Sequence, residues 1–409
     1  MVAALSRPWL VAILSVTVLL YAVDMFRTTR GFDRADFSCL YLWARAARDN
    51  LNPYTVDFEP MAARLHLHTD GMDHADYPPT FILLFEPLTS VSPKAAYWLW
   101  TGLNAAALAA TLLLLLGGDS GLDLRLKVAF AALAIIYYPI RVHFFWGQTQ
   151  LVLLLMLLLA SRWLERGREA AAGLILALAG LLKIFPLFIV GYLVVERRWR
   201  ALFFTGIGLA LGAAATVALF GLPNSLAFGP RLANFAGGRW PAVHGKTDSV
   251  ELVSLGVFVS RLFAGVTGAH PGSALDWGRP LAVMLAALAL VGMTVHATLA
   301  RPAGRARGRR SFALWIVMAA LLSPTAWLHY MVLLLVPYAG LAVAANRGEA
   351  SRRAIWTGVA SYALTQFSPE AFAGLQAILP WSVVLPLAKG WYPCATLLAY
   401  GSAYWLTVD

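Results

Sequence analysis

Long runs of apolar residues recur along the whole chain, and short polar segments separate them. Many runs approach the roughly 20 residues that an α-helix needs to cross a lipid bilayer. The pattern therefore predicts an all-α, polytopic membrane protein with ten crossings. The expected crossings cover residues 8–25, 95–117, 127–142, 150–162, 201–220, 278–300, 311–325, 331–345, 354–371 and 389–406.

Two further apolar stretches are too short to span the membrane in the ordinary way. Residues 170–195 leave one basic loop and return to another, yet two full crossings need roughly 40 residues. They predict a pair of short helices, broken near "LLKIFP" (181–186). The proline-interrupted stretch "PPTFILLFEPLTSV" (78–91) is expected to be re-entrant or interfacial. With the short pair, the total is about 10 to 12 transmembrane helices.

Clusters of arginine set the expected orientation of these helices. Short cytoplasmic loops of membrane proteins are rich in Lys and Arg, so we place the four most basic connections in the cytoplasm. Residues 27–94 and 221–277 then form external loops. The first of these loops also carries several arginines, but loops of that length cross the membrane largely regardless of charge. We expect a single integral-membrane domain over residues 1–409. The basic connections are 161–169, 196–200, 301–310 and 346–353.

The composition excludes several other classes of protein. Hydrophobic residues make up 60% of the chain and charged residues 13%, whereas soluble domains average about 45–50% and 25%. The net charge is +11, but the arginines stand in short clusters between the apolar runs. This pattern is typical of membrane topology, so we expect no nucleic-acid partner. Cys39 and Cys394 are far apart, and no Cys/His spacing suggests structural zinc. The run from Trp9 has no small-residue cleavage site after it and predicts an uncleaved signal anchor.

The uncommon polar side chains fall on the expected external side. A catalytic or binding cleft on the outer face would explain this distribution, and so would the simple tolerance of external loops for polar residues. Three of them, His143, Gln148 and His329, stand at helix ends, where a histidine is more often structural than catalytic. The full set is Asp33, Asp36, Tyr77, His143, Gln148, His244, Lys246, Asp248 and His329.

Lys183 favours a cleft, because it lies between the two apolar halves of the short helix pair. A lysine inside a membrane segment costs about 2.5–3.5 kcal/mol on insertion scales and usually marks a functional pairing. The alternative is that its ammonium group snorkels to an interface. At the tip of the pair, Lys183 would be placed to bind the phosphate of an anionic lipid.

The stretch "GFDRADFSC" (31–39) follows directly on the first crossing. Beyond it, apolar residues at positions 37, 40, 41 and 44 predict an amphipathic helix near the outer interface. Asp33 or Asp36 would serve as its N-cap. The functional alternative is a carboxylate held beside the membrane surface, where a lipid-borne substrate arrives.

Five segments, in order, resemble glycosyltransferase family 87. They are Asp36-Phe37 with Tyr41, Ala44 and Asn52-Pro53-Tyr54; "YPPTFILLFEPL" (77–88); "WGQTQLVLLLMLLLA" (146–160); "AGLILALAGLLKIFPLFIV" (172–190); and "LLSPTAWLHYMVLLLVP" (321–337). No single string is specific, but the ordered set is. The sequence departs from the family pattern at Gln150, where Asn is usual, and only loosely follows it over residues 238–256.

The resemblance implies a GT-C membrane fold and inverting transfer of a sugar, mannose first, from a polyprenyl-phosphate sugar donor. The acceptor would be lipid-linked or a glycan, on the external face of a bacterial plasma membrane. Asp36 matches the family's catalytic aspartate, and Asp33 is the fallback. The predicted donor-binding positions are Lys183, His329, His143, Gln148 and Tyr77.

Several alternatives stay open at this point. A secondary transporter or lipid flippase would also place polar groups in broken helices, but it should show a matching broken pair in each half of the chain. The stretch 170–195 has no obvious counterpart. We expect no cofactor and no metal, although "FDRAD" with a third ligand could form a cation site.

Overall fold

The computed structural model describes residues 7–28, 33, 36–69, 74–117, 120–236, 249–268, 277–300, 305–376 and 378–409. Across these ranges the chain is helical, and pairing between extended segments is limited to one isolated bridge between Leu252 and Trp327. The chain forms two compact units. The first unit comprises Met1–Leu187 and Arg198–Ala233, and the second comprises Phe188–Arg197 and Asn234–Asp409.

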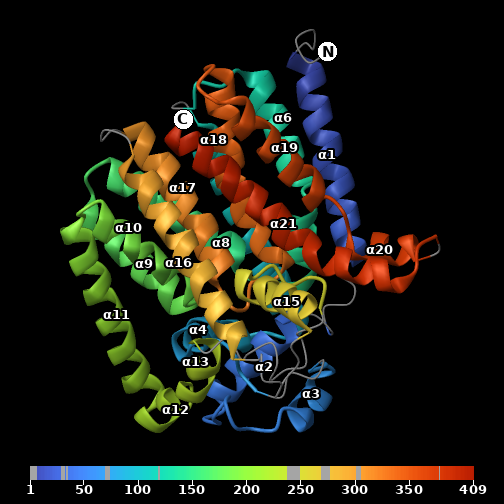
Figure 1. The fold of residues 1–409 in the computed structure, drawn as a ribbon. Helices are drawn as coiled ribbons and strands as arrows, with labels where there is room; N and C mark the ends of the chain where they lie inside the picture. Colours follow the sequence, from blue (N-terminus) through green and yellow to red (C-terminus); the bar gives the residue numbers. More distant parts are fainter. Residues whose placement is uncertain are drawn as a thin grey trace. The chain divides into compact units, whose positions relative to one another are not determined.

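The first unit begins with a helix, four shorter helical elements and a long helix, and further helices follow (Figure 1). The elements are α1 (Arg7–Thr28), α2 (Asp36–Arg48), α3 (Glu59–Leu65), α4 (Pro79–Phe85), η3 (Glu86–Ser90), α5 (Pro93–Leu116), α6 (Leu124–Ile135), α7 (Tyr138–Trp146), α8 (Gln150–Glu165), α9 (Glu169–Leu182), α11 (Trp199–Phe220), α12 (Leu222–Leu226) and α13 (Gly229–Ala236). The segment η5 (Phe185–Ile189) leads from this unit into the second.

In the second unit, α17 is deeply buried, since every residue from 311 to 321 is buried. Helices α16, α18 and α21 pack against α17, and α19 lies alongside α21. The hydroxyl of Tyr338 on α18 lies 2.7 Å from Ser361 Oγ on α19. The elements are α10 (Val190–Val195), α15 (Leu255–Thr267), α16 (Gly278–Leu299), α17 (Arg305–Leu322), η6 (Leu328–Leu334), α18 (Leu335–Asn346), α19 (Arg352–Thr365), α20 (Pro369–Leu375) and α21 (Trp381–Val408).

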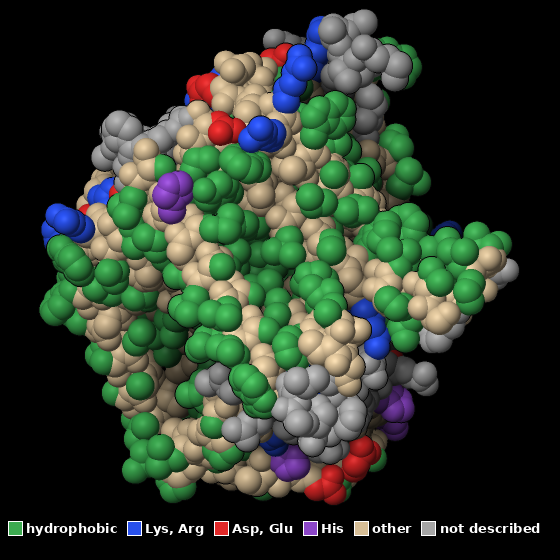
Figure 2. All heavy atoms as spheres, in the orientation of Figure 1, with side chains coloured by type: hydrophobic (Ala, Val, Ile, Leu, Met, Phe, Trp, Pro, Cys, Tyr) green, Lys and Arg blue, Asp and Glu red, His purple; other side chains and the backbone are tan. Residues whose placement is uncertain are grey.

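Helices form at all ten expected crossings, and within the described residues four are long and apolar enough to span a membrane. These four are α5, α11, α16 and the continuous segment Leu328–Asn346. On the face drawn in Figure 2, hydrophobic side chains cover much of the surface. Large hydrophobic residues on α11 are more than half exposed, among them Phe203 and Leu219. An apolar surface of this extent suits contact with lipid better than contact with water. The total of 10 to 12 crossings stays a prediction.

The expected single crossing at 127–142 is wrong in one respect, because it is two helices. Helices α6 and α7 meet at an angle of 47°, and together they satisfy the criteria for a fifth span. Tyr137 is the N-cap of α7 and Pro139 lies in its first turn. Proline has no N–H to donate to the preceding turn, so the helix ends and starts again there.

The predicted break in 170–195 agrees with the structure. Helix α9 ends at Leu182, and Lys183 follows with an extended backbone (φ −153°, ψ 139°). Glycines bring α9 and α11 into close contact, as small residues do between membrane helices. A Cβ atom on Gly173 would lie 2.2 Å from Ala201 O, and one on Gly212 would lie 2.3 Å from Leu181 Cδ1.

The helix predicted after Asp36 is present, but it is buried on all sides and not on one apolar face alone. Every residue of α2 from Phe37 to Ala44 is buried, including the positions expected to face outward. The segment ending at Thr69 covers one side, where Ser38 Oγ donates to His68 O at 2.6 Å and Cys39 Sγ donates to Thr69 O at 3.4 Å. The segment that follows α3 therefore covers the start of α2, which the helical periodicity alone did not indicate.

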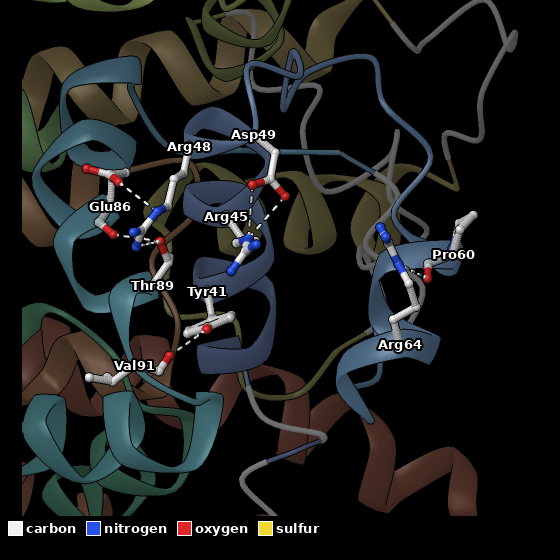
Figure 3. A network of polar contacts seen from close by, with 9 residues as sticks. All are labelled: Tyr41, Arg45, Arg48, Asp49, Pro60, Arg64, Glu86, Thr89 and Val91. Carbon is white, nitrogen blue, oxygen red and sulfur yellow. Dashed lines mark hydrogen bonds and ion pairs between the residues drawn. The ribbon is translucent and has the colours of Figure 1, made fainter.

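A polar network holds the other end of α2 against η3 (Figure 3). Arg48 Nε lies 3.7 Å from Glu86 Oε1, and Arg48 Nη1 donates to Thr89 Oγ1 at 3.4 Å. Tyr41 donates to the carbonyl of Val91 at 2.8 Å. Glu86, an unusual acid within an apolar stretch, is thus the partner of an arginine on α2.

Candidate active site

Asp36 is the first residue of α2 and lies at the start of the buried part of that helix. The prediction that it would precede the helix as an N-cap is therefore wrong. Its carboxylate turns towards the connection between α7 and α8, where Gln148 Nε2 donates a hydrogen bond to Asp36 Oδ2. Asp33 has a different partner, since its Oδ2 lies 3.8 Å from His68 Nε2. The two acids of "FDRAD" are thus physically distinct.

Gln148 joins three other side chains that are far apart in the sequence. Its Nε2 donates to Asp36, and its Oε1 accepts from Tyr77 Oη at 2.9 Å and from Lys183 Nζ at 3.5 Å. The ammonium group of Lys183 also lies 4.7 Å from the centre of the Tyr77 ring, in cation–π distance. We call Asp36, Tyr77, Gln148 and Lys183 the amide cluster. It contains the predicted catalytic acid and three of the five predicted donor-binding residues.

The backbone turn at Gly147 positions Gln148. Gly147 ends α7 in the left-handed region (φ 64°, ψ 40°), and its N–H donates to carbonyls of the last turn of α7. A Cβ atom at this position would lie 2.7 Å from the Cβ atom of Phe37. Only glycine satisfies both the positive φ and this close approach to α2. The turn therefore touches α2 at two consecutive residues, Asp36 and Phe37.

Tyr77 and Lys183 are also fixed by neighbouring groups. Tyr54 donates to the carbonyl oxygen of Tyr77 at 2.8 Å, and burial raises the pKa of the Tyr54 phenol, so it remains a protonated donor. Thr80 Oγ1 on α4 donates to Leu181 O at 2.5 Å, which ties the end of α9 beside the cluster. The Tyr77 phenol and the Lys183 ammonium group thus contact Gln148 from backbone segments that hydrogen bonds hold in place.

The chemistry of the amide cluster combines a possible proton acceptor with a cation. A carboxylate at the start of a helix can take a proton from an approaching hydroxyl, provided that it is held in place. A lysine ammonium group can stabilise negative charge that develops on a phosphate oxygen. The Gln148 amide couples the two groups without neutralising either, since it donates to the carboxylate and accepts from the ammonium group. No group of three or more His, Cys, Asp or Glu residues with metal-site geometry occurs within the described ranges.

The side chains of the two predicted donor-binding histidines have other partners. His143 is fully buried, and its Nε2 lies 2.9 Å from Asn104 Oδ1 on α5. His329 belongs to the second unit, where it lies in η6 with 5% exposure and its ring centre is 5.4 Å from that of Tyr330. His244, Lys246 and Asp248 lie outside the described residues.

Two polar residues on α5 were not among the predicted site residues. Asn104 and Trp100 lie in an otherwise apolar crossing, and both make hydrogen bonds near the turn that carries Gln148. A lone amide such as Asn104 inside a membrane helix is itself a signal, because an unsatisfied polar group is costly there. The sequence alone gave no indication of which partner would satisfy it.

Gly147→Ala is expected to lower the free energy of unfolding by about 1–3 kcal/mol, because it forces a left-handed alanine against Phe37. Thermal unfolding of the purified protein in detergent would measure this. Gly102→Ala is the matched control, since a Cβ atom there meets nothing within 4 Å. Equal stability of the two variants would show that the turn does not require glycine.

The chain consists of apolar helices, and a cluster of a carboxylate, an amide and an ammonium group lies at helix ends. These two features define the class of protein, which is a helical membrane protein with a candidate enzymatic site. The sequence model of glycosyltransferase family 87 matches residues 76–324, which is more than half of the chain. The chain belongs to glycosyltransferase family 87, and it is therefore a glycosyltransferase. The match includes Tyr77, Gln148 and Lys183, but it begins after Asp36 and ends before His329. No curated protein and no solved structure matches the chain.

Proposed function

We propose that the protein transfers a hexose, mannose first among the sugars, from a polyprenyl-phosphate sugar donor. The acceptor is a lipid-linked sugar or a glycan on the external face of the plasma membrane. The observation that carries this proposal is the Gln148 amide, which places the carboxylate of Asp36 and the ammonium group of Lys183 on its two ends. This pairing matches the two demands of the reaction, namely proton removal from the acceptor and stabilisation of a phosphate leaving group.

In this mechanism Asp36 is the general base. It takes the proton of the acceptor hydroxyl while the acceptor oxygen attacks the anomeric carbon of the sugar. The bond between that carbon and the phosphate oxygen breaks, and its electron pair leaves with the polyprenyl phosphate. One direct displacement inverts the anomeric centre.

Lys183 stabilises the charge that develops on the departing phosphate, and Tyr77 and Gln148 hold hydroxyl groups and the base in place. The family's use of a lipid-borne donor agrees with the apolar surface of the helices, along which a prenyl chain can lie. The role of His329 in binding sugar or phosphate stays a prediction.

Transfer activity is tested with the full chain in lipid nanodiscs. The nanodiscs are supplied with a panel of polyprenyl-phospho-sugars and with extracted membrane lipids as acceptors, and mass spectrometry detects the product. We expect a hexose added to an acceptor, because an enzyme needs no gradient and no second compartment. Movement of the donor across sealed vesicles without any product would instead identify a transporter or flippase.

A further inference from the structure

The turn that presents Gln148 to Asp36 is held from one side by α5. Three side chains of α5 at positions 97, 100 and 104 lie on one stripe of the helix, at spacings of three and four residues. All three are buried, and each makes a polar contact with α7 or with the turn that follows it. We call Tyr97, Trp100 and Asn104 the α5 clamp.

Each contact of the clamp fixes a different part of the turn. Tyr97 Oη donates to Phe144 O at 3.4 Å, and Trp100 Nε1 donates to Gly147 O at 2.8 Å. Asn104 Oδ1 lies 2.9 Å from His143 Nε2. The clamp thus engages the last turn of α7 and the residue immediately before Gln148.

The hydrogen-bond directions at Asn104 are determined by its second contact. Asn104 Nδ2 donates to the carbonyl oxygen of Trp100 at 3.0 Å, so Oδ1 is the atom that faces His143. That oxygen can only accept, and His143 therefore carries its proton on Nε2. The backbone carbonyl of His143 in turn accepts from Gln148 N at 3.1 Å. Asn104 is thus connected to Gln148 through a single residue.

The clamp also contacts the residue that follows the base Asp36. The ring of Tyr97 lies edge-to-face against Phe37, with centroids 5.1 Å apart. Phe37 follows Asp36 directly and touches Gly147. The same face of α5 therefore supports both halves of the hydrogen bond between Gln148 and Asp36.

We propose that Trp100, Asn104 and His143 are positioning residues, which set the geometry of the base Asp36 through the turn that carries Gln148. This inference rests on the proposed function and assigns His143 to the support of the site, in agreement with its complete burial. A misplacement of about 1 Å in a catalytic group can cost on the order of 10²-fold in rate. Loss of one clamp contact should therefore lower kcat and leave donor binding intact.

The test uses Trp100→Phe and Asn104→Leu in the full chain, each of which removes the clamp contact and keeps the general shape of the side chain, aromatic in one case and γ-branched in the other. Each variant is expected to lower kcat by about 10-fold, with the KM for the donor unchanged. Thr111→Val is the control for Asn104→Leu, because Thr111 is buried on the same helix and its hydroxyl has no hydrogen-bond partner among the described residues. Trp356→Phe is the control for Trp100→Phe, because Trp356 is 68% exposed and lies on α19 of the second unit. Neither control should change kcat.

The decisive measurement repeats both substitutions in the Gln148→Ala background. Residues that act only through Gln148 have no further effect once it is removed, so the effects should be non-additive. If each variant lowers kcat by the same factor with and without Gln148, the proposal is overturned. An unchanged kcat for both variants in the wild-type background also overturns it.

Hydrogen exchange distinguishes this inference from the proposed function. Backbone amides of residues 144–152 are expected to exchange faster in Trp100→Phe and Asn104→Leu than in the two control variants. If the wild-type protein transfers no sugar, the proposed function fails, and the catalytic role of the clamp fails with it. The exchange rates still decide whether the clamp holds the turn. Equal rates in the two clamp variants and the two control variants would show that it does not.

Discussion

Asp36→Asn is expected to reduce kcat by about 10²-fold or more, because general bases contribute 10²–10⁴-fold to the rates of enzymes. The asparagine oxygen can still accept the hydrogen bond from Gln148 Nε2 that the carboxylate accepts now. The substitution therefore removes the base and preserves the geometry, so donor binding should be unchanged. Product formation and donor affinity, measured on the same preparation in nanodiscs, separate the two effects.

Asp33→Asn is the matched control for this experiment. Asp33 lies three residues away, and its carboxylate faces His68 instead of Gln148. We expect near wild-type kcat for this variant. An active Asp36→Asn enzyme together with an inactive Asp33→Asn enzyme would move the base to Asp33.

Lys183→Met is expected to weaken donor binding by about 10- to 100-fold. Hydrogen bonds to charged groups contribute roughly 1.5–3 kcal/mol, and each 1.4 kcal/mol is a factor of ten in affinity. Methionine keeps an unbranched apolar side chain in the break after α9 but removes the charge. Titration with an unreactive polyprenyl phosphate would measure the loss.

Two further variants make the Lys183 result interpretable. Lys183→Arg keeps the positive charge and should restore part of the affinity. Lys94→Met removes an exposed lysine from the first turn of α5 and should have no effect. If donor affinity is unchanged in Lys183→Met, the lysine does not bind the phosphate, and its interaction with the Gln148 amide would be purely structural.

Local sequence signals were sufficient for much of the helical pattern. The break at Lys183 could be predicted because two basic loops enclose a stretch too short for two crossings. The bend between α6 and α7 was missed, although Pro139 marks it, because the apolar run continues through the bend without interruption. Hydropathy records whether a segment can lie in lipid, but it does not record how the backbone turns there.

The burial of α2 could not be predicted from its own residues. Its periodicity indicated one apolar face, whereas the segments around Thr69 and Val91 cover the other faces. These contacts join residues about 30 and 50 positions apart in the chain. Periodicity describes a single helix and carries no information about the loop that packs over it.

The four residues of the amide cluster are likewise brought together only by the tertiary structure. Lys183 could be predicted as a site residue because it is a charge in an apolar segment, but no local sequence pattern connects it with Gln148 or Tyr77. Their association as site residues came from the family resemblance. The clamp residues Trp100 and Asn104 had no such resemblance to mark them, and they become apparent only through their contacts with Gly147 and His143.

The anomeric configuration of the product shows whether the sugar is transferred in one direct displacement with Asp36 as the base. The enzyme would be supplied with a donor whose sugar is β-linked to the phosphate, and the product linkage would be assigned by NMR. A single base and one direct displacement predict an α-linked product. A β-linked product would contradict this mechanism, because one direct displacement by a base-activated hydroxyl inverts the anomeric centre.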